Sequence, residues 1–438
     1  MPASTPSTPR PHLGLRDLVL FNIAAVAGIR WLSAAAHTGS GSLTLWLLAA
    51  VLFFVPSALA IAALSERHPE QGGIYMWTSK AFGDWHGFLC GWCYWLSNLF
   101  YLPNLLVAGV GMTAYALGFG EHQGAILSVS LGILWVSLMA QIAGASFGKW
   151  VSNVGAAATY SAGLLLIGLG LWVWSTSGSA TPLDLAPRWD LDKLNFWSQI
   201  AFAFGGLELS AVMSAEIHNP RRTVPLAAWI SGFGITAFYI LGTLALLVLL
   251  APDSISILTG LVQAGDAAGL RLGMPWISVV LGGLVIAGVA GQFGAWLGGS
   301  ARILFAIGID SALPPVLTRA HPRWGTPHIA ILMQGVVCTA FVLALQYGEN
   351  LRIAYQLLVD MTVITYLIPF LYMFAASGKY GNRWSSLSGL LVTVLAIVLS
   401  LVPPADAQSV WWFEAKLVGG CAALILAARL CYRGPSRR

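Results

Sequence analysis

Long apolar segments separated by short polar joints run through most of the sequence. An α-helix rises 1.5 Å per residue, so about 20 apolar residues cross the roughly 30 Å hydrocarbon core of a bilayer. The pattern predicts an all-α polytopic membrane protein with about 12 transmembrane helices. These are expected at residues 18–38, 43–64, 86–113, 123–143, 151–174, 195–217, 223–250, 275–309, 327–347, 350–375, 385–402 and 409–431.

The composition supports this class and excludes others. Of the 438 residues, 57% are hydrophobic and 9% are charged, whereas a soluble domain carries about 25% charged residues. A soluble or disordered protein is therefore excluded, and the lipid bilayer is the first expected partner. Basic residues exceed acidic ones by only five and form no long run, so nucleic acid is not expected as a partner.

The basic residues also predict the orientation. If the N-terminus is cytoplasmic, sixteen of the 22 basic residues lie on the cytoplasmic side and Arg30 lies within a span. The other side keeps five: Arg188, Lys193, Arg271, Arg352 and Lys416. Basic residues concentrate on the cytoplasmic side of membrane proteins. We therefore expect a multi-pass protein of the cell (cytoplasmic) membrane with both termini in the cytoplasm.

Three ionisable residues lie near the middle of predicted spans: Arg30, Glu208 and Asp360. A charge at the centre of a bilayer costs about 2.5–3.5 kcal/mol on insertion scales, so it normally faces the protein interior or a water-filled cavity. Two interpretations remain open at this stage. Arg30 and Glu208 can form a structural pair between two helices, or the charges can belong to a substrate or ion site.

The surroundings of two of these charges are alike. Gly28-Ile29-Arg30 and Gly206-Leu207-Glu208 each place a charge two residues after a glycine, at similar depth in spans that run in opposite directions. Matching interruptions in two oppositely oriented halves are the sequence pattern of an inverted repeat, with the binding site of a transporter at the breaks. The pattern therefore favours a carrier over a channel or an intramembrane enzyme.

Three polar joints carry a resemblance to a known family. They are Pro69–Tyr75 with the following Ala81-Phe82-Gly83, the loop Ala215–Pro225, and Ser300-Ala301-Arg302 with the later Gly325-Thr326-Pro327. In this order they resemble the amino acid–polyamine–organocation (APC) permeases, over the first ten predicted helices.

The resemblance implies the LeuT/APC-like fold, a five-plus-five inverted repeat in which helices 1 and 6 are broken and alternating access exposes the substrate. It implies that helices 3, 8 and 10 line the path. The substrate carboxylate would meet backbone N–H groups of Ala27, Gly28 and Ile29, and the ammonium would meet carbonyls of Phe204 and Gly205. The candidate substrate-binding residues are Ala27, Gly28, Ile29, Arg30, Trp31, Phe204, Gly205, Gly206 and Glu208.

Two departures from the family pattern bear on substrate and coupling. A single Gly28 stands where a Gly-x-Gly break is usual, and Arg30 follows it. A guanidinium there favours anionic or dicarboxylic substrates, or else it is neutralised by Glu208. The span 151–174 has no lysine, which proton-coupled relatives can carry there. The coupling or gating candidates are therefore Glu208, Asp360 and Arg30, and the glutamate–aminobutyrate exchangers are the first branch to consider.

The sequence thus predicts a secondary transporter for amino acids or related amines and carboxylates, working by exchange or linked to protons. A sodium-coupled or facilitative carrier of another small solute is the alternative. The expected organisation is a disordered cytoplasmic tail (1–12), a transport core (13–375, with repeats at about 13–174 and 195–375), two additional C-terminal helices (385–431) and a basic cytoplasmic tail (432–438). Neither enzymatic activity nor a cofactor or metal is expected, and the oligomeric state is left open.

Overall fold

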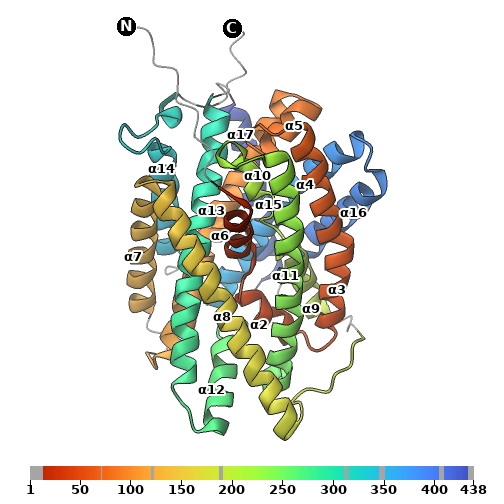
Figure 1. Ribbon diagram of the computed structural model, residues 1–438, viewed down its shortest axis with the longest axis vertical. Helices are drawn as coiled ribbons and strands as arrows, with labels where there is room; N and C mark the ends of the chain where they lie inside the picture. The colour runs from red at the N-terminus through yellow and green to blue at the C-terminus, as the bar shows by residue number, and fades with distance from the viewer. Residues whose placement is uncertain are drawn as a thin grey trace.

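The computed structural model describes residues 13–70, 72–119, 123–186, 191–309, 313, 315–344, 351–403 and 409–432. This part of the chain forms a bundle of helices elongated along one axis (Figure 1). Its one extended pairing is an isolated parallel bridge between Leu13 and Ile217. The predicted tail at 1–12, and all of the predicted tail at 432–438 except Tyr432, lie outside the described residues.

The helices follow one another with short connections. The first half contains α1 (Leu15–Val26), α2 (Arg30–His37), α3 (Ser42–Ala49), the π-helical turn η1 (Ala50–Phe54), α4 (Val55–Arg67), α5 (Ile74–Phe82), α6 (Asp84–Ala116), α7 (Gln123–Ile142) and α8 (Ala145–Ser177). The second half contains α9 (Leu191–Phe202), α10 (Leu209–Val212), η2 (Ser214–Glu216), α11 (Pro220–Leu249), η3 (Pro252–Ser254), α12 (Gly260–Leu272), α13 (Ile277–Ile309), η4 (Pro315–Thr318), α14 (His328–Ala344), α15 (Leu351–Lys379), α16 (Arg383–Leu399) and α17 (Val410–Cys431).

Each predicted transmembrane segment overlaps at least one of these helices. In the described part of the chain, eight helices are long and apolar enough to cross a membrane, or nine if the bent pair α1 and α2 counts as one span. Two further apolar helices, α14 and α16, are shorter. The all-α membrane fold is therefore confirmed, and twelve crossings remain a prediction. The short helices α5 and α12 were not expected.

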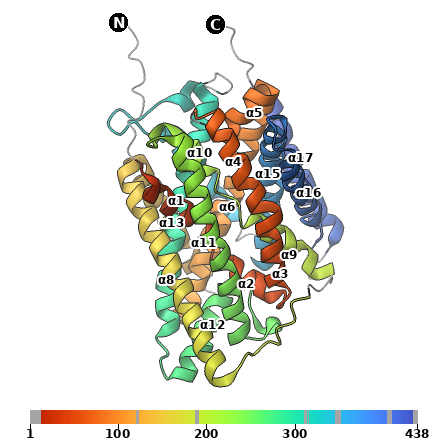
Figure 2. The same cartoon turned by 45° about the vertical axis from the view of Figure 1, so that its right-hand side comes forward.

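Burial separates the centre of the bundle from its flank. The most apolar stretches of α6 and α15 are 72% and 78% buried, whereas that of α17 is 17% buried. Figure 2 shows α16 and α17 on one flank of the bundle. The residues that surround the two helix breaks therefore come from the central helices.

The two broken helices cross in opposite directions. Helix α1 packs beside α10, and α2 packs beside α9. The first half of one broken helix thus lies against the second half of the other, which is the arrangement that an inverted repeat requires. Figure 2 shows α1 and α2 one below the other, on either side of the first break.

Both interruptions occur where the sequence pattern placed them. The first spans Ala27–Ile29, and the two helices that flank it are bent by 46°. The second spans residues 203–208. Gly206 has a φ of +116°, which L-residues with a Cβ rarely adopt. A Cβ at Gly205 would lie 2.4 Å from the ring of Tyr366, so only glycine lets this ring approach.

Candidate functional site

One hydroxyl group ties the two breaks together. The oxygen of Tyr239, on α11, lies 2.7 Å from the carbonyl oxygen of Val26 and 2.9 Å from that of Ala203, so its proton is shared between them. The N–H of Gly28 donates to the same hydroxyl at 3.3 Å. The Tyr239 ring is buried and stacks on Trp46 at 4.4 Å. The end of α1, the first break and the end of α9 are therefore held around one phenol.

Several backbone groups at the breaks keep their hydrogen-bonding capacity. Within the described residues, the N–H of Ile29 has no partner, and the carbonyls of Phe204 and Gly205 accept no hydrogen bond. The other predicted N–H groups are occupied: that of Ala27 donates to the Ile23 carbonyl at 2.9 Å, and that of Gly28 to Tyr239. Buried backbone groups are normally paired, so these open groups are unusual for a buried position.

The end of α1 is capped by side chains that sequence reasoning did not single out. The Ala25 carbonyl accepts from Gln292 Nε2 at 3.0 Å and from Trp296 Nε1 at 2.7 Å, both on α13. The sequence signal for Gln292 was that it is the single amide side chain of α13. Both lone pairs of this carbonyl are therefore used.

Glu208 is buried beside the second break. Its Oε1 accepts hydrogen bonds of 2.6 Å from the hydroxyls of Tyr94 and Tyr366, and its Oε2 accepts one of 3.0 Å from the N–H of Gly206. The two tyrosines come from α6 and α15, and neither was predicted. Three neutral donors thus hold the carboxylate in place.

Arg30 is buried beside the first break, 5% exposed. Its Nη1 donates to Oδ1 of Asn104, on α6. The guanidinium carbon lies 4.2 Å from the ring centre of Trp31 and 4.8 Å from that of Tyr101. The pair of Arg30 with Glu208, which the sequence left open, is therefore not formed, because each side chain has its own neutral partners.

Five aromatic side chains fill the space between these two charges, and we call them the central aromatic cluster: Tyr94, Tyr101, Phe202, Trp296 and Tyr366. Between ring centres, Tyr101 lies 5.0 Å from Trp296 and Phe202 lies 5.0 Å from Tyr366. The ring centres of Trp296 and Tyr366 are 5.6 Å apart. Trp31 contacts the cluster through Phe202, and the centres of these two rings are 5.6 Å apart. The site therefore has one cationic end and one anionic end with apolar rings between them.

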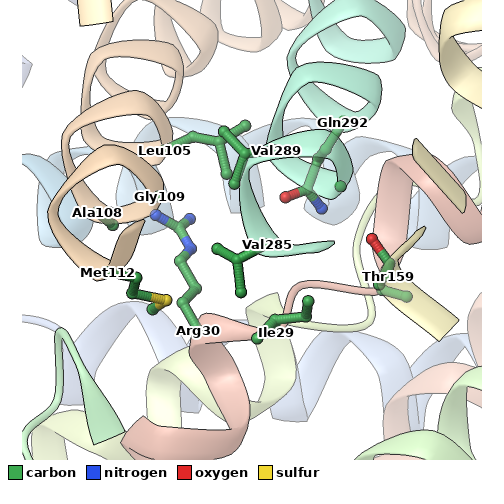
Figure 3. Close-up of a pocket in the computed structure, with 12 residues that line it drawn as sticks. Ile29, Arg30, Leu105, Ala108, Gly109, Met112, Thr159, Val285, Val289 and Gln292 are labelled. Carbon is green, nitrogen blue, oxygen red and sulfur yellow. The ribbon is translucent and has the colours of Figure 1, made fainter. Parts of the chain in front are cut away.

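A small cavity of about 20 Å³ adjoins the first break. It is lined by α6 and α13, the third and eighth predicted spans, with contributions from the break and from α8: Ala27, Ile29, Arg30, Leu105, Ala108, Gly109, Met112, Thr159, Val285, Gly288, Val289 and Gln292 (Figure 3). This volume holds about one water molecule. A larger solute would fit there only if the cavity widened.

Asp360 lies elsewhere in the bundle. It is fully buried on α15 and accepts hydrogen bonds of 3.1 and 3.3 Å from Gln356 Nε2, one turn away. It is close enough to Cys421, on α17, to act on that thiol electrostatically. The structure therefore brings Arg30 and Glu208 to the breaks and leaves Asp360 on the side of α17. Among the described residues, no group of three or more His, Cys, Asp or Glu side chains is arranged to hold a metal ion.

Comparisons with known proteins agree with this geometry. The chain is 29% identical to an uncharacterized transporter of Legionella pneumophila, over 93% of this chain and 94% of the relative. It is 26% identical to AguD of Lactococcus lactis, named as a probable agmatine/putrescine antiporter, over 78% of this chain and 74% of the relative. It is 22% identical to the glutamate/gamma-aminobutyrate antiporter of Lactococcus lactis, over 82% of this chain and 78% of the relative.

The fold has a counterpart among solved structures. The crystal structure of MhsT in complex with L-phenylalanine superposes with a TM-score of 0.60 over 91% of this chain and 98% of that chain, at 15% identity. This confirms the LeuT/APC-like fold. The family model described as amino acid permease matches residues 13–413. The match confirms the resemblance carried by the three polar joints, and the chain belongs to the amino acid permease family of membrane transporters.

Proposed function

We propose that the protein is a secondary transporter that exchanges amino acids, or related amines and carboxylates, across the cytoplasmic membrane by alternating access. One observation carries the proposal. Two antiparallel helix breaks, joined by Tyr239, present open backbone groups of opposite polarity at a buried position: the N–H of Ile29 and the carbonyls of Phe204 and Gly205. Discontinuous helices use such groups to bind polar solutes inside a membrane protein.

The polarity of the site matches a substrate with two charged ends. An N–H group and Arg30 lie at one break, where a carboxylate is favoured. Open carbonyls and Glu208 lie at the other break, where an ammonium is favoured. The nine residues that the sequence suggested remain our proposed binding set: Ala27 to Trp31, Phe204 to Gly206, and Glu208. We add Tyr94, Tyr366 and Asn104 to it.

The backbone carbonyls at the end of α1 favour exchange over sodium coupling. Backbone carbonyls at such an end can coordinate a cation when they are free. Here the Ala25 carbonyl accepts two side-chain hydrogen bonds and the Val26 carbonyl accepts the proton of Tyr239. Fixed donors thus occupy the oxygens that a cation would need. Two relatives are named as antiporters, which agrees with exchange.

A proton remains a proposed participant in the cycle. Glu208 is buried, lies at the break and contacts two tyrosines that also belong to the central aromatic cluster. A proton on this carboxyl would change its hydrogen bonds to both rings at once. Asp360 is the second candidate, with α15 as its link to the site.

The organisation and orientation are proposals of the same kind. We assign the transport core to residues 13–375 and regard α16 and α17 as additional helices, in keeping with the low burial of α17. The excess of basic residues on one side of the predicted spans supports cytoplasmic termini.

Counterflow in proteoliposomes tests the proposal. Vesicles loaded with an unlabelled amino acid or amine should take up the labelled compound faster than empty vesicles, because a carrier returns faster when it is loaded. A panel of acidic, neutral and basic amino acids and simple amines covers the proposed class. Flux that grows linearly with concentration, without stimulation from inside, would contradict a carrier.

A further inference from the structure

Arg30 is buried and carries a positive charge. In the described part of the chain it forms no ion pair. Glu208 is occupied by Tyr94, Tyr366 and Gly206, and Asp360 is bonded by Gln356. A buried charge costs several kcal/mol unless it is paired. The fold nevertheless buries the Arg30 guanidinium, and Arg30 borders the cavity.

The neighbours of Arg30 orient its guanidinium without neutralising it. Asn104 accepts from Nη1, and the Asn104 amide is itself held by a 3.1 Å hydrogen bond from its Nδ2 to the Tyr355 carbonyl. The rings of Trp31 and Tyr101 pack against the guanidinium. These contacts fix the direction of the guanidinium. Because all of the contacting groups are uncharged, the guanidinium keeps its full charge.

One donor of this guanidinium is unused. Nε of Arg30 is buried and has no hydrogen-bond partner among the described residues. Figure 3 shows the side chain rising from the start of α2 between the cavity-lining residues of α6 and α13. A guanidinium binds a planar carboxylate through two parallel N–H groups. An unused Nε beside a cavity is therefore suited to an anion that enters from that cavity.

We propose that Arg30 and Asn104 form an anion subsite that selects solutes carrying a carboxylate. This deepens the proposed function and rests on it. The preferred solute carries an ammonium, bound towards Glu208, and a carboxylate bound by Arg30, as amino acids and ω-amino acids do. A diamine of the same length is disfavoured, because its second ammonium would face the guanidinium across a medium of low dielectric constant.

Two probes of equal chain length separate these chemistries. 4-Aminobutyrate and putrescine each contain four carbon atoms, and they differ in having a carboxylate or a second ammonium at one end. 3-Aminopropanoate and 1,3-diaminopropane form a second pair that differs in the same way. Counterflow in proteoliposomes with the full chain should favour 4-aminobutyrate over putrescine by at least about tenfold, the worth of one charge-assisted hydrogen bond, and 3-aminopropanoate over 1,3-diaminopropane.

The decisive variant supplies the missing counter-ion from within the chain. Asn104→Asp places a carboxylate on the atom that already accepts from Arg30, so the guanidinium becomes paired. We expect the variant to fold as well as the wild type and to lose its preference for the member of each pair that carries a carboxylate. Arg30→Gln should lose the same preference, and Arg30→Lys should retain part of it.

Asn22→Asp is the matched control. Asn22 is also fully buried and binds Ser231, away from Arg30, so the preference should survive this change. Equal exchange of both members of each pair by the wild type, or a preference that persists in both Asn104→Asp and Arg30→Gln, would overturn the subsite. Failure of all probes to exchange would instead contradict the proposed function.

Discussion

The hydroxyl of Tyr239 donates a 2.7 Å hydrogen bond to the carbonyl oxygen of Val26, the last residue of α1. These two residues are 213 positions apart, in the first and second halves of the chain. The contact therefore joins the two repeats at the place where their broken helices cross. It also explains how two short half-helices keep their unsatisfied ends in the middle of an apolar bundle.

Removal of this hydroxyl should loosen both breaks. Tyr239→Phe leaves the carbonyls of Val26 and Ala203 and the N–H of Gly28 without their shared partner. An unsatisfied buried group costs about 1–3 kcal/mol, so thermal unfolding in detergent should begin at a lower temperature and counterflow should fall. Tyr160→Phe is the control, because the Tyr160 hydroxyl is buried without a partner among the described residues. Equal stability of the two variants would argue against this role.

Gly206→Ala should disrupt the second break. Gly206 has a φ of +116°, and a Cβ there would lie 2.9 Å from Cγ2 of Val26. The left-handed backbone alone costs a residue with a Cβ about 1–2 kcal/mol. We expect a reduced yield of monodisperse protein in size-exclusion chromatography. Gly283→Ala, on α13 with no atom within 4 Å of its Cβ, should be tolerated, and a similar loss in both variants would refute the explanation.

Glu208→Gln should flatten the pH dependence of exchange. The amide keeps the shape of the carboxyl group and a hydrogen-bonding role towards Tyr94 and Tyr366, but it cannot take up a proton. Counterflow measured from acid to neutral pH, with equal pH on both sides, checks this. Asp360→Asn should keep the wild-type profile. If instead Asp360→Asn flattens the pH profile and Glu208→Gln keeps it, the coupling group is Asp360.

Arg302 and Glu216 should act as one unit. They belong to two of the sequence joints that carried the family resemblance, and they meet through hydrogen bonds of 2.9 and 3.3 Å with limited exposure. Removal of one partner leaves the other charge partly buried, at a cost of about 1–3 kcal/mol. Arg302→Gln and Glu216→Gln should each lower the unfolding temperature, and the double variant should lose less than the sum. If the two single losses in unfolding temperature add up to the loss in the double variant, the ion pair does not contribute to stability.

Exchange should proceed equally well when choline replaces sodium. The Ala25 carbonyl already accepts from Gln292 and Trp296, so the end of α1 offers no free oxygen there for a cation. Initial rates of counterflow in matched sodium and choline buffers provide the measurement. A sodium gradient that drives accumulation of substrate above equilibrium would contradict this expectation.

The sequence alone predicted the location of the long apolar helices and of both breaks because these features depend on local composition. About 20 apolar residues must become a helix in a bilayer, since no water is available there to satisfy the backbone. The two Gly-x-charge tripeptides stood out because charges are rare within such segments. Arg30 and Glu208 were found for this reason.

The partners of those residues depended on how the helices pack. Tyr239, Tyr94, Tyr366 and Asn104 resemble many other aromatic and amide residues in this chain, and nothing near them in the sequence distinguishes them. Gln292 and Ala25 are 267 residues apart, and Glu208 and Tyr366 are 158 apart. Only the crossing of the helices brings such pairs within hydrogen-bonding distance. Length and polarity of each segment therefore determined the elements, whereas the tertiary structure decided which polar groups are satisfied and which, such as Nε of Arg30, have no partner among the described residues.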